Sequence, residues 1–201
     1  MKTVSFGTRH LVILSLLGAI LLVLSWTPLG YLNIGPLAIT FNMVPVAIGA
    51  VVLGPSGGAA LGFIFGITSA LQCVGIGGTS AMGVILFGID PVLAVLQRVI
   101  PRVLAGWIAG WVSRLVRRWK PGLSGYATGF AAAALNTLLF MTALVMMFGS
   151  TDYLQGLMAG RNVVSFIIAF VGVNALVEAI ATTAVVGAIC RALEKTKLIG
   201  G

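Results

Sequence analysis

Long runs of apolar residues follow one another along almost the whole chain, and this pattern constrains the fold more than any single motif. We place six runs near residues 9–26, 36–53, 57–73, 91–113, 124–149 and 161–191. The hydrocarbon core of a bilayer is about 30 Å thick, and a helix needs roughly 17–25 apolar residues to cross it. We therefore predict an all-α integral membrane protein, with a single membrane domain over residues 1–201 and six transmembrane helices in a compact bundle.

Charged residues are scarce, as this prediction requires. They make up 8% of the 201 residues, while 59% are hydrophobic, whereas soluble domains carry about 25% charged residues. A soluble chain this apolar could not cover its surface with polar groups, so the composition excludes an ordinary soluble protein.

The segments between the runs carry turn-forming residues. The sequence "GPSGG" separates the second and third runs at residues 54–58, and Asp90 followed by Pro91 is typical of a helix start. The stretches 120–125 and 149–156 supply further breaks. We predict that the glycine-rich stretch 74–90 is a loop over the outer mouth of the bundle.

The distribution of lysine and arginine predicts the orientation in the membrane. Nine of the twelve basic residues fall before the first run, between the fourth and fifth runs, or after the sixth: Lys2, Arg9, Arg114, Arg117, Arg118, Lys120, Arg191, Lys195 and Lys197. With six helices all three groups lie on one side, and the positive-inside rule makes that side cytoplasmic. We predict cytoplasmic termini, and we attribute the net charge of +8 to these juxtamembrane clusters and not to nucleic-acid binding.

Two further basic residues, Arg98 and Arg102, interrupt an apolar run. They are four residues apart, so on a helix they share a face, and they lie about 10 and 16 Å beyond Pro91. A charge at this depth costs at least about 2.5–3.5 kcal/mol unless it faces inward. We predict that both line an anion-binding pocket in the outer half of the membrane; alternatively, Arg98 reaches the interface and Arg102 holds loop carbonyls.

Pro101 lies between the two arginines in sequence. A proline inside a helix has no N–H group, so the carbonyl four residues earlier, that of Gln97, loses its helical partner. We therefore expect a free backbone acceptor beside the two cations.

Other polar residues at membrane depth are candidates for the same pocket. The residues we select are Asn42, Gln72, Asn136 and Arg161. Asparagine in a helix bundle also serves as a hydrogen bond between helices, and that alternative stays open here. Rise per residue places Glu178, with Asn174 one turn away, close to the cytoplasmic face and deeper than either arginine.

Enzymatic motifs are weak or absent. "GPSG" at residues 54–57 matches an intramembrane serine protease pattern, but the only histidine, His10, starts the first run. The sequence has no phosphate-binding loop, no metal-ligand spacing and no cofactor motif. We predict a protein that has no catalytic residue, metal or cofactor and does not hydrolyse ATP itself.

The sequence "LGYLNIGPLAITFNMVPVAIGAVVLGPSGGAALGFIFGITSALQ" (29–72) resembles the second and third helices of the substrate-binding S component of energy-coupling factor (ECF) vitamin transporters. Within that family, the same stretch and "PRVLAG" (101–106) are similar to the pantothenate-type branch. The resemblance implies a subunit of the prokaryotic plasma membrane that captures a vitamin near the outer face. It also implies partners, namely a membrane coupling subunit and two cytoplasmic ATPases, with a substrate-carrying subunit that topples in the bilayer.

The resemblance also implies a docking feature on the first helix, where two small residues four apart allow close approach of the coupling subunit. The nearest match is Ser15 with Ala19, next to Gly18, although an alanine is usual at the first position. Internal packing of the first helix is the alternative.

Pantothenate suits the candidate residues chemically. Its carboxylate would pair with Arg102 or Arg98, and its amide and hydroxyl groups would meet Asn136 and Gln72. An apolar wall from Phe41, Met43 or "VILF" (84–87) would hold its dimethyl group. Lipoate or biotin would satisfy the same arginines, and a self-sufficient channel or facilitator for small solutes is the alternative from another class.

Overall fold

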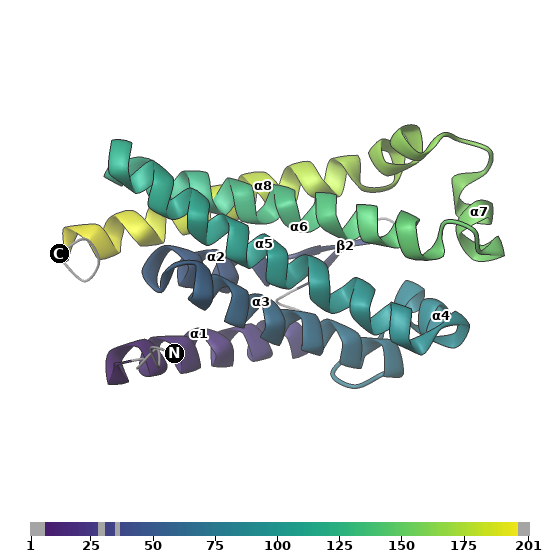
Figure 1. Cartoon of the computed structure of the whole chain (residues 1–201), viewed down its shortest axis with the longest axis horizontal. Helices are drawn as coiled ribbons and strands as arrows, with labels where there is room; N and C mark the ends of the chain where they lie inside the picture. The colour runs from purple at the N-terminus through teal and green to yellow at the C-terminus, as the bar shows by residue number, and fades with distance from the viewer. Residues whose placement is uncertain (1–6, 28–30, 35–36, 197–201) are drawn as a thin grey trace, which may run out of the picture.

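The computed structural model describes residues 7–27, 31–34 and 37–196 (Figure 1). Within this part of the chain there are eight α-helices: α1 (Thr8–Trp26), α2 (Met43–Val52), α3 (Gly54–Leu71), α4 (Ala81–Ile89), α5 (Pro91–Trp119), α6 (Ser124–Phe148), α7 (Asp152–Met158) and α8 (Val163–Lys195). A hairpin of β1 (Tyr31–Ile34) and β2 (Leu37–Thr40) precedes α2, and short 3-10 turns cover Gln72–Val74 and Pro121–Leu123.

Among the described residues, five segments are long and apolar enough to cross a membrane: Thr8–Trp26, Gly54–Val74, Pro91–Trp119, Pro121–Phe148 and Val171–Lys195. The shorter α2 is apolar as well. The prediction of an all-α membrane protein is therefore confirmed, while the count of six spans stays a prediction.

The predicted helix over residues 36–53 is wrong in its first third. The antiparallel hairpin pairs Tyr31 with Thr40 and Ile34 with Leu37, and α2 begins only at Met43. The backbone N–H of Asn42 donates to the Thr40 hydroxyl (3.1 Å), which joins the hairpin to the helix. Ten residues rise about 15 Å, so α2 alone is too short for the hydrocarbon core.

The predicted loop over residues 74–90 is only partly a loop. Its glycine-rich start keeps positive φ angles at Gly75, Gly77 and Gly78, as glycine allows. Its second half forms α4, because Ser80 is an N-cap whose hydroxyl accepts from the N–H of Gly83 (3.2 Å). The glycine-rich composition of this stretch therefore did not reveal that its second half is a short apolar helix.

Glycines bring α3 and α5 into direct backbone contact. A Cβ atom on Gly58 or Gly106 would overlap the carbonyl oxygen of the other, and one on Gly62 would overlap the carbonyl of Arg102. Small residues allow such close packing of membrane helices. This contact sets the position of Arg102 relative to α3.

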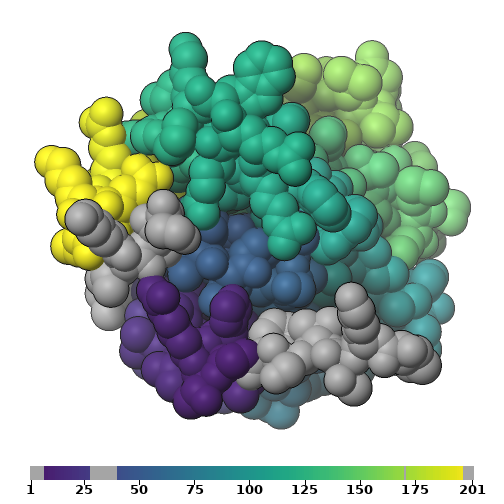
Figure 2. Space-filling model, turned by 60° about the vertical axis from the view of Figure 1, so that its left-hand side comes forward, coloured from purple at the N-terminus to yellow at the C-terminus, as the bar shows by residue number. Residues whose placement is uncertain are grey.

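The two ends of the bundle differ in chemistry. The start of α1, the end of α5 and the end of α8 lie together, and α4 and α7 lie at the opposite end (Figure 1). Figure 2 shows the former end, where purple α1, teal α5 and the yellow end of α8 surround the blue residues of α2 and α3. Arg9, Arg117 and Lys195 belong to these helix ends, whereas Lys2 and Lys197 lie outside the described residues.

Candidate functional site

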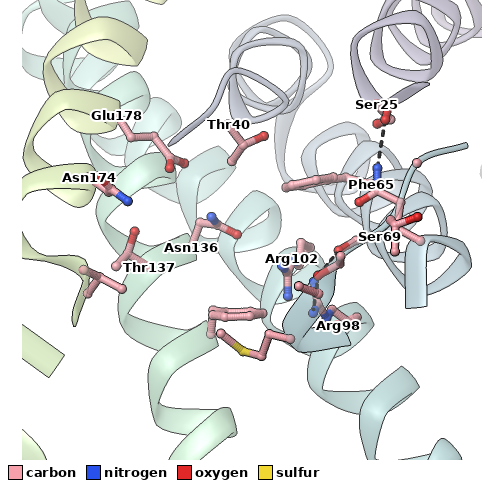
Figure 3. A pocket seen from close by; sticks show the side chains of 18 of the residues that line it. Ser25, Thr40, Phe65, Ser69, Arg98, Arg102, Asn136, Thr137, Asn174 and Glu178 are labelled. Atoms are coloured by element: carbon pink, nitrogen blue, oxygen red, sulfur yellow. Dashed lines mark hydrogen bonds between the residues drawn. The ribbon is translucent and has the colours of Figure 1, made fainter. Parts of the chain in front are cut away.

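A cavity of ≈ 710 Å³ lies in the half of the bundle that contains α4, and α1, α3, α5, α6 and α8 contribute to its walls (Figure 3). The volume is within the range of about 300–1,000 Å³ typical of small-ligand sites. The side chains that carry polar or charged groups into its lining include Ser25, Thr40, Ser69, Gln72, Ser80, Arg98, Arg102, Asn136, Thr137, Asn174 and Glu178. Its larger apolar lining residues are Trp26, Phe65, Met82, Phe140, Met141 and Val171.

Arg98 lines the cavity and is buried. Its two terminal nitrogens donate to the hydroxyl of Ser69 on α3 (3.2 Å) and to that of Ser80 before α4 (3.1 Å). Its Cζ atom also lies 5.5 Å from the centre of the Phe140 ring. Three separate elements thus hold this guanidinium at the cavity wall.

Arg102 lines the cavity one turn further along α5. Its Nη1 atom donates to the carbonyl of Gln97 (3.2 Å), the acceptor that Pro101 frees from the helix, so that prediction is confirmed. The Cζ atom lies 4.2 Å from the centre of the Phe140 ring and 5.4 Å from that of Phe65, which are cation–π contacts.

Glu178, Asn174, Asn136 and Thr137 form a second polar group, on the α6 and α8 side of the cavity (Figure 3). The Glu178 carboxyl interacts with the side chain of Asn136, with the backbone of Thr40 and with the charge of Arg102. The cavity therefore has a cationic side on α5 and an acidic and amide side on α6 and α8.

The expectation that Glu178 lies deeper than the arginines is wrong. This expectation takes residue 161 as the edge of the hydrocarbon core, but α8 has 33 residues and rises about 50 Å, whereas the core is only about 30 Å thick. Glu178 lines the same cavity as Arg98 and Arg102, so it lies at their level in the bundle. Because the first residue of α8 lies outside the hydrocarbon core, a depth that is counted from this residue is too large.

The chain as a whole matches a family model. The model describes the ECF transporter, substrate-specific component, and the match covers residues 9–190. The chain belongs to this family. It is a substrate-specific membrane subunit of an ECF importer, a multi-pass protein of the cell membrane that works with a substrate and an energy-coupling module. No curated protein matches the sequence significantly.

Four of the six predicted substrate residues of this S component line the cavity: Gln72, Arg98, Arg102 and Asn136. The Nε2 atom of Gln72 donates to the backbone carbonyl of Ser25 (2.8 Å), so this residue also ties the end of α3 to the end of α1. Its position at the wall suits a contact with the substrate, and its hydrogen bond to α1 suits a role in holding two helices together.

Two predicted substrate residues, Asn42 and Arg161, are not among the lining residues. Asn42 is fully buried at the start of α2, because the hairpin occupies the place where we expected helix. Arg161 is exposed before the first residue of α8. Neither side chain belongs to the cavity wall of the S component.

The predicted apolar wall is also different. Phe65, Phe140, Met82 and Met141 line the cavity, whereas Phe41 and Met43 do not. Phe140 was detectable, since it follows Asn136 by four residues and so shares its helix face. Phe65 and Ser69 are likewise four apart on α3, inside the stretch that carries the family resemblance.

The small residues of α1 point in different directions. Ser15 and Ala19 are exposed, whereas Gly18 is buried, with the side chain of Ile64 on α3 3.4 Å from where its Cβ would be. Ser15 and Ala19 therefore remain available to a partner, while Gly18 serves contact with α3.

Proposed function

We propose that this S component captures an anionic vitamin, with pantothenate favoured, and holds its carboxylate between Arg98 and Arg102. The observation that carries the proposal is the charge of the cavity. Its described lining has two guanidinium groups and a single carboxyl, Glu178, which leaves one excess positive charge if all three are ionised. A ligand with one carboxylate balances that charge in a site where low polarity strengthens ion pairs.

The remaining lining suits a pantothenate-sized molecule. Asn136, Thr137 and Asn174 offer hydrogen-bonding groups, and Phe65 with Met82 offers apolar surface for a dimethyl group. An apolar wall with a few convergent polar groups is the usual form of a small-ligand pocket.

In the proposed transport cycle, the S component binds the vitamin and other subunits supply the energy. The S component binds the vitamin from the outer side, because the cavity lies at the end of the bundle away from the basic helix ends, which the positive-inside rule assigns to the cytoplasm. A membrane coupling subunit and two cytoplasmic ATPases complete the transporter, and ATP hydrolysis drives the toppling that carries the vitamin inward.

Equilibrium binding of labelled pantothenate to the purified S component in detergent tests this proposal. We expect tight binding by the wild type and, in Arg102→Ala, a loss of about 2–5 kcal/mol, which is at least roughly 30-fold in Kd. Arg118→Ala is the matched control, because Arg118 is exposed on the same helix far from the cavity. Binding of labelled lipoate or biotin that is lost in Arg102→Ala, without binding of pantothenate, would change the substrate but keep the site.

A further inference from the structure

Two buried oxygen atoms on the α6 and α8 side of the cavity have no hydrogen-bond donor among the described residues. They are Oε1 of Glu178 and Oδ1 of Asn136. Both residues line the cavity, and each side chain is only 6% exposed (Figure 3). A buried acceptor without a donor is unfavourable, so these atoms indicate a group that is absent from the protein itself.

The direction of the Asn136 amide follows from its neighbour. The Glu178 carboxyl has a side-chain hydrogen bond with Asn136, and the Oδ1 atom of Asn136 takes part in no hydrogen bond among the described residues. The amide nitrogen of Asn136 therefore faces Glu178, and the amide oxygen is left as an acceptor. Together the two side chains place a pair of acceptors without donors in the wall of the cavity.

We propose that Glu178 and Asn136 determine specificity by requiring a neutral hydrogen-bond donor, a hydroxyl or amide N–H, on the substrate at the end remote from its carboxylate. The inference rests on the proposed function, since the carboxylate occupies Arg98 and Arg102. Charge favours a neutral donor over an ammonium group. A substrate with both a carboxylate and an ammonium group would leave the excess positive charge of the lining unbalanced.

This requirement separates the candidate vitamins by chemistry. Pantothenate has hydroxyl groups, and biotin has ureido N–H groups, at the end remote from the carboxylate. The dithiolane ring of lipoate has no N–H or O–H donor. A site built to hydrogen-bond a substrate group rejects an analogue that lacks it far more strongly than an apolar pocket rejects a missing methylene.

The test is direct equilibrium binding of labelled pantothenate, biotin and lipoate to the purified S component. We expect the wild type to bind at least one donor-bearing vitamin roughly 100-fold or more tighter than lipoate. The double variant Asn136→Leu with Glu178→Leu removes both acceptors together, which is less disruptive than leaving one partner buried alone. We expect its preference to fall below about tenfold, with lipoate binding unchanged or tighter.

A matched control and a milder variant guard against a folding defect. Thr182→Val changes another buried polar side chain, one turn beyond Glu178 and outside the cavity lining, and should leave the preference unchanged. Glu178→Gln keeps the shape but removes the charge, and should weaken binding of the donor-bearing vitamin more than that of lipoate. Thermal unfolding of each variant without ligand confirms that it is folded.

The outcomes separate this inference from the proposed function. Lipoate bound as tightly as the other vitamins, or an unchanged preference in the folded double variant, overturns the role of Glu178 and Asn136. Binding that is lost in Arg102→Ala would still support the proposed function in that case. If none of the three vitamins binds the wild type, the proposed function fails and this inference fails with it.

Discussion

At the scale of single residues, the guanidinium of Arg102 combines a charge with a flat face. Its Cζ atom lies 4.2 Å from the centre of the Phe140 ring, and its Nη1 atom donates to the Gln97 carbonyl. The ring contact uses the flat face of the guanidinium, and the hydrogen bond uses one of its N–H groups. A lysine ammonium has the same charge but no planar array of N–H donors.

Arg102→Lys should therefore weaken pantothenate binding by roughly tenfold or more, although the formal charge of the cavity is retained. Arg118→Lys, at an exposed position of the same helix, is the control. Titration of the labelled vitamin measures both, and an unaltered Kd in Arg102→Lys would mean that charge alone holds the carboxylate.

At the scale of elements, α5 combines a tight contact with an interrupted hydrogen-bond ladder. Its backbone meets α3 at Gly62 and Gly106, and Pro101 interrupts the ladder beside Arg102. The acceptor that stabilises the buried arginine thus comes from the helix that carries it.

Pro101→Ala should restore the N–H that bonds the Gln97 carbonyl within the helix and so compete with Arg102 for it. We expect a loss of roughly two- to tenfold in pantothenate affinity, the worth of one net hydrogen bond. The unfolding midpoint without ligand should stay equal or rise. Pro91→Ala is the control, because the first residue of α5 has no helical acceptor for a restored N–H, and equal affinities in the two variants would contradict the argument.

At the scale of the whole molecule, α1 is the least covered of the long helices. Only 22% of the residues in its apolar stretch are buried. Leu16 and Ile20 are exposed beside Ser15 and Ala19. The helix closes the cavity only through its last residues, Ser25 and Trp26. Its remaining exposed face contributes no residue to the cavity lining and therefore suits lipid or a coupling subunit.

Ala19→Leu should leave vitamin binding by the isolated S component unchanged and lower ATP-driven uptake by the assembled transporter several-fold, because a larger side chain prevents close helix approach. Ala184→Leu is the control, since Ala184 is also exposed but lies on α8. Uptake by liposomes that hold only the S component would contradict the division of labour and favour a self-sufficient facilitator.

The sequence alone was sufficient for the membrane class, the inward-facing Arg98 and Arg102 and the free carbonyl of Gln97. Each follows from a local rule: helix length against bilayer thickness, the cost of a charge in hydrocarbon, and the missing N–H of proline. The family resemblance was also local, carried by residues 29–72 and 101–106, and the family match over residues 9–190 confirms it.

Only the tertiary structure decided which distant residues meet. Glu178 shares the cavity with Arg102 because α8, with 33 residues, is longer than the hydrocarbon core is thick, so its first residue does not mark the edge of the core. Asn42 lies outside the cavity because a hairpin replaces the expected start of a helix. The depth of a side chain in the membrane and the residues that it contacts depend on how its helix packs against neighbouring helices. The sequence pattern within one segment carries no information about that packing.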